Sequence, residues 1–293
     1  MENKFKERTL PAPAKINIYL GVTGKRDDGY HDIDSVMQTV GIFDKVKVAV
    51  GENASGKRIE VVCPGHEELG GEKNIAYRMT EAFMRYANIE NYNVYIEIEK
   101  NIPMEAGIGG GSSDAAEVVI ALDRLCGTGF STDELMRIGK TVGADVPFLI
   151  KKGTAFVQGI GEKITPCKAL PEATVLVAYP NDEKVSTGKA YAAIDEGGVF
   201  STGEAFEAMK KAVEAEDLDM IAAASYNIFE TVIPSYSSIF DIKKTMMEYG
   251  AVFSLMSGSG SAVFGIFREE GPAKKAAEAL SGISRTFVCG FCK

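Results

Sequence analysis

The sequence predicts a mixed α+β fold, and three observations support this. Some segments alternate apolar and polar residues, which is typical of strands, and others repeat apolar residues at helical spacing. The two kinds of segment follow one another without regular βα alternation, which argues against a doubly wound parallel sheet. The chain of 293 residues is long enough for a substantial core in one large or two moderate domains.

The first third of the chain is expected to be rich in strands. Ile16, Ile18 and Leu20 alternate with more polar residues, which predicts a strand with one apolar face. Alternating apolar residues at 46–50 and 59–61 predict a hairpin closed by the loop 51–56. A helix is expected over residues 74–86 and another strand over residues 94–98.

The most distinctive segment follows that strand and leads into a helix. It reads Pro103-Met104-Glu105-Ala106-Gly107-Ile108-Gly109-Gly110-Gly111-Ser112-Ser113-Asp114-Ala115-Ala116. Glycine admits positive φ and lets a backbone approach a ligand closely. The helix that follows presents unpaired N–H groups and the positive end of its dipole, and Ser112 or Ser113 is expected to cap it. The segment therefore predicts an anion site, and the anion expected is a polyphosphate.

The remaining elements continue the mixed pattern. Helices are expected over residues 132–142, 202–214, 218–224, 235–249 and 272–280, strands over 175–180, 263–267 and 285–291, and a glycine-serine turn over 254–261. Pro166 and Pro171 interrupt the pattern, which suggests a domain join near residues 162–171. We expect an N-terminal ATP-binding domain over residues 1–163 and a C-terminal domain over residues 164–293.

Two familiar phosphate motifs do not fit. The dinucleotide fingerprint requires a third glycine where Ser112 stands. A Walker loop beginning at Gly51 fails at Arg58, where Ser or Thr is required, and residues 59–62 look like a strand rather than a helix. These near matches favour a hairpin loop at 51–56 and a different nucleotide-binding family for the segment 103–116.

Composition limits the classes of partner. The net charge of −9 disfavours nucleic-acid binding, which requires clustered Lys and Arg. No apolar run reaches membrane-spanning length and the charged N-terminus lacks an apolar signal core, so a cytoplasmic protein without a membrane partner is expected. Five scattered cysteines do not resemble a disulfide framework. Cys63, His66, Cys289 and Cys292 are expected to be separate groups rather than a zinc site, because only one pair has C-x-x-C spacing.

Four further segments carry a resemblance to a known family. They read Pro13-Ala14-Lys15-Ile16-Asn17, Asp28-Gly29-Tyr30-His31, Gly143-Ala144-Asp145-Val146-Pro147-Phe148 and Met256-Ser257-Gly258-Ser259-Gly260. With the glycine segment they resemble the GHMP small-molecule kinases, in family order from residue 11 to 261. Within that family they are similar to the kinases whose acceptor carries a cytidine diphosphate group.

The resemblance implies a two-domain fold, an activity and partners. The N-terminal domain would resemble the second domain of ribosomal protein S5, and the C-terminal domain would be ferredoxin-like α+β. The activity implied is transfer of phosphate from ATP to the 2-hydroxyl of a cytidine-diphosphate-linked polyol, in the non-mevalonate route to isoprenoid precursors. Mg²⁺ would be carried by the nucleotide, with no metal site of the protein's own. The protein would act as a monomer or weak homodimer.

The resemblance also implies site residues. Lys15 would orient the acceptor hydroxyl and balance charge, although a lysine and Asn17 two apart on a strand also suit a solvent face. Asp145 would act as the base, although a residue before Val146-Pro147 also suits a helix cap. Residues 103–113 would bind the phosphates of ATP, with Asn74 and Lys100 at its adenine. The cytidyl substrate would contact a second set: Asn17, Tyr30, His31, Thr187 and Tyr191.

One departure and two alternatives accompany this interpretation. Glu105 stands where the family commonly has a small residue, and its carboxylate would repel ATP unless it points outward, so we expect it to do so. A mevalonate- or homoserine-type kinase remains an alternative, and Tyr30 and His31 argue against it because those substrates lack a nucleobase. A catalytically silent nucleotide sensor is a second alternative, and retention of Lys15 and Asp145 argues against it.

Overall fold

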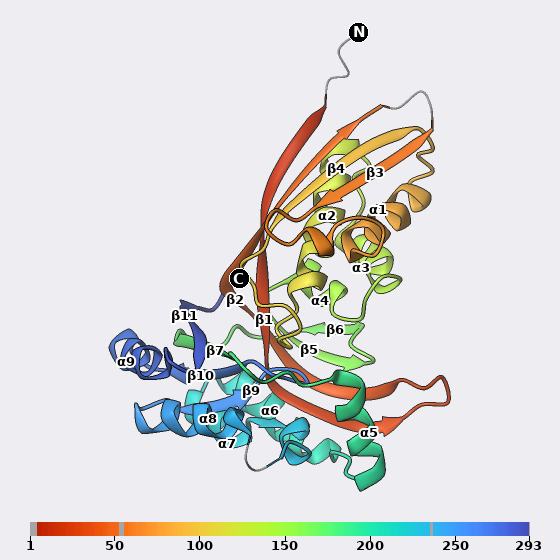
Figure 1. The fold of residues 1–293 in the computed structure, drawn as a ribbon. Helices are drawn as coiled ribbons and strands as arrows, with labels where there is room; N and C mark the ends of the chain where they lie inside the picture. The colour runs from red at the N-terminus through yellow and green to blue at the C-terminus, as the bar shows by residue number, and fades with distance from the viewer. Residues whose placement is uncertain (1–4, 53–55, 235–236, 293) are drawn as a thin grey trace. The chain divides into compact units, whose positions relative to one another are not determined.

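The structure is a computed structural model that describes residues 5–52, 56–234 and 237–292. The chain divides into two compact units, each assembled from separate segments and described here by itself. Unit 1 comprises Met1–Ala14, Ile42–Ile102 and Gly109–Lys151. Unit 2 comprises Lys15–Gly41, Pro103–Ile108 and Lys152–Lys293. The strands β1 (Lys6–Lys25) and β2 (His31–Gly51) each contribute residues to both units (Figure 1).

The sheet of unit 1 is centred on β4 (Tyr92–Glu99). It pairs antiparallel with Lys45–Gly51 of β2 and parallel with β3 (Lys57–Val62). The predicted hairpin is therefore wrong, because β4 lies between the two segments that were expected to pair. Alternation of apolar residues specifies which side chains share a face but not which strand is the neighbour. The prediction that residues 59–62 form a strand rather than a Walker helix is confirmed, since they lie within β3.

Four helices complete the described part of unit 1. They are α1 (Ile75–Tyr86), α2 (Gly110–Cys126), α3 (Thr132–Lys140) and α4 (Val146–Lys151), with the 3-10 turn η1 (Glu67–Leu69) before α1. The expected helices over 74–86 and 132–142 are confirmed to within two residues. Helix α1 packs on α2 and α3, and α2 packs on α4. Ser131 and Glu134 form a capping box that fixes the start of α3.

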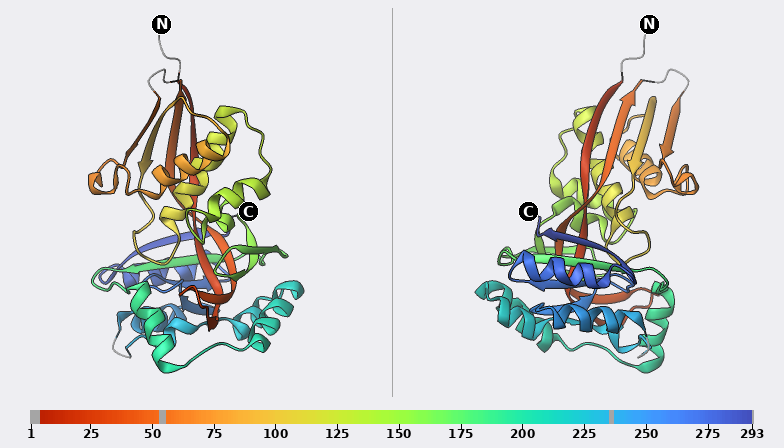
Figure 2. Two further views of the ribbon diagram at one scale, coloured as in Figure 1. Left: turned by 90° about the vertical axis from the view of Figure 1, so that its right-hand side faces the viewer. Right: turned by 60° about the vertical axis from the view of Figure 1, so that its left-hand side comes forward.

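The antiparallel sheet of unit 2 has the strand order β11-β7-β10-β9 (Figure 2). Its strands are β7 (Thr174–Pro180), β9 (Phe253–Met256), β10 (Val263–Phe267) and β11 (Ser284–Gly290). Val177 at the centre of β7 lies opposite Phe264 on one side and Phe287 on the other. The helices α8 (Ser238–Glu248) and α9 (Glu270–Leu280) pack on this sheet. The expected turn over 254–261 is wrong at its first three residues, because Ser254–Met256 belong to β9.

Unit 2 holds further elements, among which the sequence pattern revealed only the helices expected over 202–214 and 218–224. Strand β5 (Thr154–Gly159) pairs antiparallel with Ile33–Gln38 of β2 and with β6 (Lys163–Pro166). The two-residue strand β8 (Tyr226–Asn227) lies parallel to β1, with Tyr19 opposite Tyr226. The remaining elements are α5 (Thr187–Gly197), α6 (Gly203–Ala215), α7 (Leu218–Ala224) and the 3-10 turn η2 (Ile228–Thr231).

The predicted mixed α+β class is confirmed, since both units combine strands with helices. The expected boundary between residues 163 and 164 stays a prediction. Ser235, at the start of one predicted helix, lies outside the described residues, and α8 begins at Ser238. Among the residues that the structure describes, no helix is both long and apolar enough to cross a membrane.

Candidate active site

The starts of two helices lie beside each other in unit 1. A Cβ atom on Gly111, near the start of α2, would lie 3.6 Å from Ile75, the first residue of α1. A Cβ atom on Gly143 would lie 3.3 Å from Ile75 and 3.8 Å from the Ser112 hydroxyl oxygen. The turn before α4 therefore lies beside both helix starts. Free N–H groups and the positive ends of two helix dipoles suit a bound polyphosphate.

Helix α2 begins earlier than predicted. Its N-cap is Gly109, which has a left-handed backbone at φ 75°, so Ser112 and Ser113 lie within the first turn. The prediction that one of these serines caps the helix is wrong. Ser113 is buried and its hydroxyl donates a 2.7 Å hydrogen bond to the Pro13 carbonyl oxygen. Ser112 is only half-buried, and Gly111 is exposed.

Gly107 packs against a second glycine-containing turn within unit 2. The Ala262 N–H donates to the Ala106 carbonyl, and the Ser257 hydroxyl donates to the Gly107 carbonyl at 3.1 Å. A Cβ atom on Gly107 would lie 2.2 Å from the Ser257 carbonyl oxygen, and the residue has φ 76°. Glycine is therefore required at 107 for packing and for backbone conformation.

Glu105 points away from its own loop backbone into solvent. Its side chain is 76% exposed and its carboxylate lies 3.5 Å from the Lys184 amine, which is similarly exposed. The prediction that this carboxylate points outward is confirmed. Its charge is accompanied by that of Lys184, so the local repulsion expected toward a phosphate is weakened.

Lys15 and Asn17 are both buried on β1 in unit 2, which excludes the solvent-facing interpretation. The Lys15 amine donates to the Asn17 side-chain oxygen at 2.7 Å, and the Asn17 amide donates to the Ser35 hydroxyl at 2.9 Å. The Lys15 backbone N–H donates to the Ile108 carbonyl at 2.9 Å. These bonds hold Lys15 beside the end of the segment 103–108.

Asp145 is placed directly before α4 in unit 1. It is half-buried, and its carbonyl accepts from the Leu149 N–H at 3.1 Å, as expected of a residue that opens a helix. Its position beside Gly143 puts it near the converging helix starts of the same unit. A role as base stays a prediction.

Lys100 lies in a buried cluster with two aspartates that the sequence analysis did not select. Its amine donates to Asp44 and, at 2.7 Å, to Asp114. Asp44 also accepts from the N–H groups of Asn101 and Ile102, so it fixes the end of β4. Burial raises the pKa of Asp114 to about 8, and the negative charge of Asp44 acts in the same direction, while Lys100 opposes it. This cluster anchors the chain on both sides of the glycine segment.

Asn74 caps α1. Its side-chain oxygen accepts from the Ala76 N–H at 2.8 Å, and its amide donates to the Leu69 carbonyl at 2.9 Å. These contacts explain Asn74 structurally, as the buried ion pairs explain Lys100. An additional role at adenine stays a prediction for both residues.

In unit 2, a compact cluster around His31 is formed by Tyr191, Asp195 and Lys25. The ring of His31 stacks on that of Tyr191, with centroids 4.5 Å apart. The His31 Nε2 atom lies 2.7 Å from one carboxylate oxygen of Asp195, whose other oxygen accepts from Lys25 at 2.7 Å. Tyr30 is 60% exposed. The structure therefore brings together His31 and Tyr191 of the predicted substrate residues, and adds Asp195.

The sequence analysis did not select Asp195, although its spacing from Tyr191 could have indicated it. It lies four residues after Tyr191 in α5, so both side chains share one face of that helix. Thr187, at the start of the same helix, is exposed and its hydroxyl lies 2.7 Å from that of Ser259. Ser259 belongs to one of the segments that carried the family resemblance.

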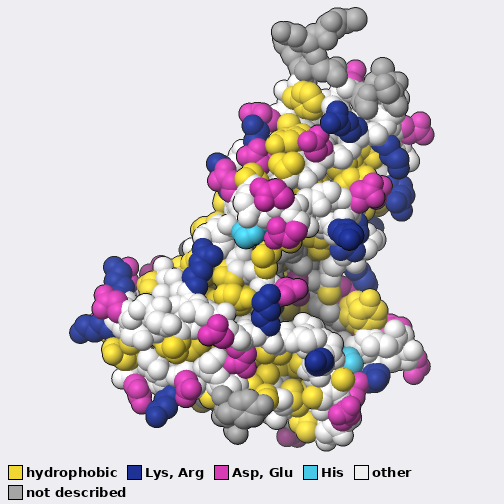
Figure 3. Space-filling view, in the orientation of Figure 1, with side chains coloured by type: hydrophobic (Ala, Val, Ile, Leu, Met, Phe, Trp, Pro, Cys, Tyr) yellow, Lys and Arg dark blue, Asp and Glu magenta, His cyan; other side chains and the backbone are white. Residues whose placement is uncertain are grey.

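The cysteines are free thiols in the structure. Burial raises the pKa of Cys167 to about 11 and that of Cys289 to about 12, so both stay protonated at neutral pH. Within the described ranges, no group of three or more His, Cys, Asp and Glu side chains is arranged to hold a metal ion. On the face drawn in Figure 3, Lys and Arg are interspersed with Asp and Glu.

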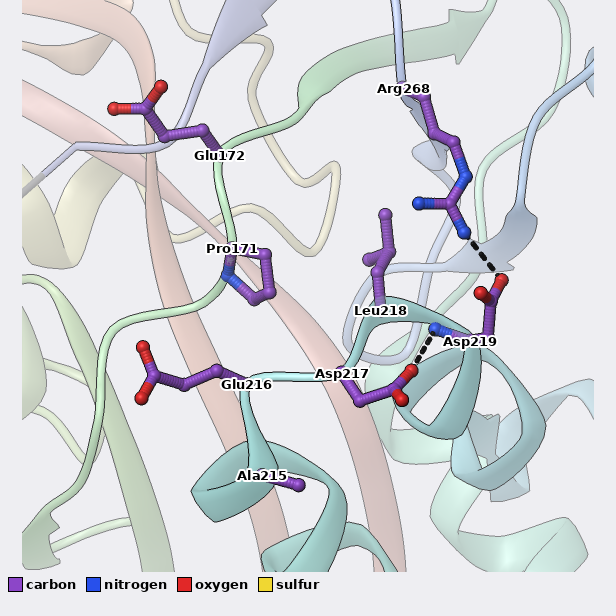
Figure 4. Close-up of a pocket in the computed structure, with 8 residues that line it drawn as sticks. All are labelled: Pro171, Glu172, Ala215, Glu216, Asp217, Leu218, Asp219 and Arg268. Carbon is purple, nitrogen blue, oxygen red and sulfur yellow. Dashed lines mark hydrogen bonds and ion pairs between the residues drawn. The ribbon is translucent and has the colours of Figure 1, made fainter.

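A pocket of about 480 Å³ lies elsewhere in unit 2, between residues 171–172 and the start of α7 (Figure 4). Arg268 at its rim pairs with Asp219 at 2.6 Å. Asp217 caps α7 by accepting from the N–H groups of Asp219 and Met220. Asp217, Asp219 and Arg268 are thus engaged in helix capping or ion pairing, and no residue that lines this pocket belongs to the predicted site.

Comparisons with known proteins agree with the segments that carried the resemblance. The model of the GHMP kinases N-terminal domain matches residues 74–153, and that of the GHMP kinases C-terminal domain matches residues 208–283.

Relatives match along nearly the whole chain. A 4-diphosphocytidyl-2-C-methyl-D-erythritol kinase of Geobacter metallireducens is 37% identical, over 97% of this chain and 98% of its own. One of Caldicellulosiruptor saccharolyticus is 40% identical, over 92% of each chain. A crystal structure of 4-(cytidine 5′-diphospho)-2C-methyl-D-erythritol kinase matches with a TM-score of 0.79 and 30% identity, over 98% of this chain and 100% of its own.

Proposed function

Because the chain belongs to the 4-diphosphocytidyl-2-C-methyl-D-erythritol kinases of the GHMP kinase family, we propose that it phosphorylates this cytidyl substrate on its 2-hydroxyl group, with ATP as donor. The observation that carries the choice of substrate is the stacked pair of His31 and Tyr191. Mevalonate and homoserine have no nucleobase for such a pair to meet. The product would serve the non-mevalonate route to isoprenoid precursors.

The phosphoryl group is transferred directly in this proposal. The 2-hydroxyl oxygen forms a bond to the γ-phosphorus, the bond from that phosphorus to the bridging oxygen breaks, and ADP leaves. Asp145 accepts the proton of the attacking hydroxyl. A loose transition state of this kind needs mainly positioning and charge neutralisation.

Lys15 supplies charge and orientation. Its buried amine is held by the Asn17 side chain, and the strand around it is held to the Ile108 carbonyl. Little side-chain entropy then remains to be lost when substrates bind. Asn17 belongs to the same chain of hydrogen bonds, and we assign it to binding of the cytidyl substrate, which accepts the phosphoryl group.

Residues 103–113 are assigned to the ATP phosphates, which meet the adjacent starts of α1 and α2. Asn74 and Lys100 are assigned to the adenine side. The half-buried Ser112 supplies the loop hydroxyl that would contact the Mg²⁺ of the nucleotide. The Ser113 hydroxyl is already used, because it donates a hydrogen bond to the Pro13 carbonyl. Mg²⁺ supplies neutralisation of the phosphate oxygens when bound.

The cytidyl end is assigned to Tyr30, His31, Thr187 and Tyr191. A base stacked on an aromatic ring gains about 1–3 kcal/mol. The exposed Tyr30 ring has room to cover such a base, while Tyr191 already supports His31.

A coupled ADP-release assay with three acceptors tests this function. We expect turnover with 4-diphosphocytidyl-2-C-methyl-D-erythritol and background rates with mevalonate and homoserine. Preference for either of the latter would establish the alternative kinase. ATP binding without ADP release from any acceptor would establish the silent sensor. Gel filtration over a range of concentrations tests the expected monomer or weak homodimer.

A further inference from the structure

Asp195 is joined to the proposed base-binding cluster by a single well-placed hydrogen bond. One of its carboxylate oxygens lies 2.7 Å from His31 Nε2, although the two residues are 164 positions apart in the chain. His31 is only 7% exposed and Asp195 is 22% exposed, so water competes little for this bond. The Tyr191 ring stacked on His31 holds the imidazole plane in place.

This bond determines which imidazole nitrogen carries the hydrogen. Hydrogen bonds from Lys25 and His31 hold the pKa of Asp195 below its ordinary value, so the carboxylate is ionised at neutral pH. An ionised carboxylate only accepts hydrogen bonds, so Nε2 of His31 must donate. When the ring carries a single hydrogen on Nε2, the Nδ1 atom is an acceptor, and the hydrogen bond to Asp195 is the one that His31 makes through its ring in the described part of the chain.

We propose that Asp195 is a positioning residue that makes the enzyme select cytosine over uracil, by holding His31 in the tautomer whose Nδ1 accepts a hydrogen bond. The proposal rests on the proposed function, because it takes His31 as the contact to the base. Cytosine and uracil differ at ring position 4, where cytosine carries an amino group and uracil a carbonyl group. The amino group donates to Nδ1, whereas the carbonyl oxygen would face another acceptor.

The size of the selectivity follows from the cost of that mismatch. Leaving a buried acceptor opposite another acceptor costs about 1–3 kcal/mol, which corresponds to about 5- to 150-fold in affinity. An asparagine at position 195 would relax this choice, because its side-chain amide both donates and accepts. Either tautomer of His31 would then find a partner at Nε2, and Nδ1 would be free to donate to uracil.

The tautomer can be observed without any turnover. The chain has two histidines, so the His66→Gln substitution leaves one imidazole in the ¹⁵N spectrum. We expect the Nε2–H tautomer of His31 in this background, and a mixture of tautomers when Asp195→Asn is added. A dominant Nδ1–H tautomer in the first protein would overturn the proposal.

Binding then measures the selectivity directly. Cytidine 5′-diphosphate and uridine 5′-diphosphate are titrated by calorimetry with the ATP site filled by a non-hydrolysable ATP analogue. We expect the ratio of their affinities to fall at least about fivefold in Asp195→Asn, within the range set by one hydrogen-bond mismatch. Glu196→Gln removes the same charge from the next, exposed position of α5 and should keep the ratio.

His31→Ala separates the two levels of the proposal. If it leaves cytidine 5′-diphosphate binding unchanged, His31 does not meet the base, and the assignment under the proposed function fails together with this inference. If it weakens binding but Asp195→Asn leaves the affinity ratio unchanged, the base contact stands and the role of Asp195 is refuted. A merely structural Asp195 would lower both affinities equally and would also leave the ratio unchanged.

Discussion

The adjacent starts of α1 and α2 in unit 1 and the His31 cluster in unit 2 offer a ligand different kinds of group. The first offers backbone N–H groups and helix dipoles, and its side chains mainly hydrogen-bond to the surrounding backbone, as Ser113 and Asn74 do. The second offers an imidazole nitrogen and aromatic faces, positioned by a carboxylate from a distant part of the chain. The difference suggests that phosphate binding tolerates side-chain changes that leave the backbone intact, while base recognition depends on individual side chains.

Asp145→Asn tests whether a side-chain carboxylate in the first region can be replaced without loss of ATP binding. We expect kcat to fall by about 10²- to 10⁴-fold, the usual contribution of a positioned base. ATP affinity should change little, because the backbone groups remain. Steady-state kinetics and ATP titration measure the two quantities. Asp133→Asn, an exposed change in the first turn of α3, is the control, and near-normal kcat for Asp145→Asn would refute the base assignment.

Gly107→Ala tests the backbone itself. The new methyl group would meet the Ser257 carbonyl at 2.2 Å in a left-handed conformation. We expect the free energy of unfolding to fall by about 2–4 kcal/mol, from overpacking and backbone strain together. Urea denaturation measures this loss. Gly271→Ala, in an open position of α9, should be neutral or slightly stabilising, and an equally small effect at Gly107 would mean that the two loops separate easily.

His31→Ala tests the second region. We expect KM for the cytidyl substrate to rise about 10- to 100-fold, from the loss of one hydrogen bond and its ring support, with KM for ATP nearly unchanged. His66→Ala, at the other and more exposed histidine, should alter neither constant. Equal effects of His31→Ala on both substrates would contradict the division of labour between the two regions.

The smallest effect concerns the buried cluster of Lys100, Asp44 and Asp114. The pKa of Asp114 is raised in the folded state to about 8, so the folded protein binds more protons than the unfolded chain between about pH 4 and pH 8. Stability should therefore fall as pH rises, by about 1 kcal/mol between pH 7 and pH 9. Asp114→Asn should flatten this dependence in urea denaturation at the two pH values. A slope that persists in Asp114→Asn would assign the titration to another group.

The same contrast explains how much the sequence predicted. The helix starts and the glycine segment are local features, so apolar spacing and glycine content predicted them closely, although the N-cap fell on Gly109 rather than on a serine. The pairing of β3 with β4 instead of β2 depends on tertiary contacts that alternation does not encode. Asp195 and Asp44 were missed for the same reason, because their partners are distant in the chain. The family resemblance supplied His31 and Tyr191, whose types alone would not have indicated a base.

The segmented make-up of unit 2 limits how the gene can be divided. A fragment that ends at residue 163 would keep Tyr19 and Val40 but lose their strand partners Tyr226 and Phe291. The complementary fragment would retain β7 and β11 yet lack the residues of β1 and β2 that belong to the same unit. Expression of either fragment alone would leave unpaired strand edges, which favour aggregation. Co-expression of the two pieces is therefore the form in which a split version of this enzyme would be expected to assemble.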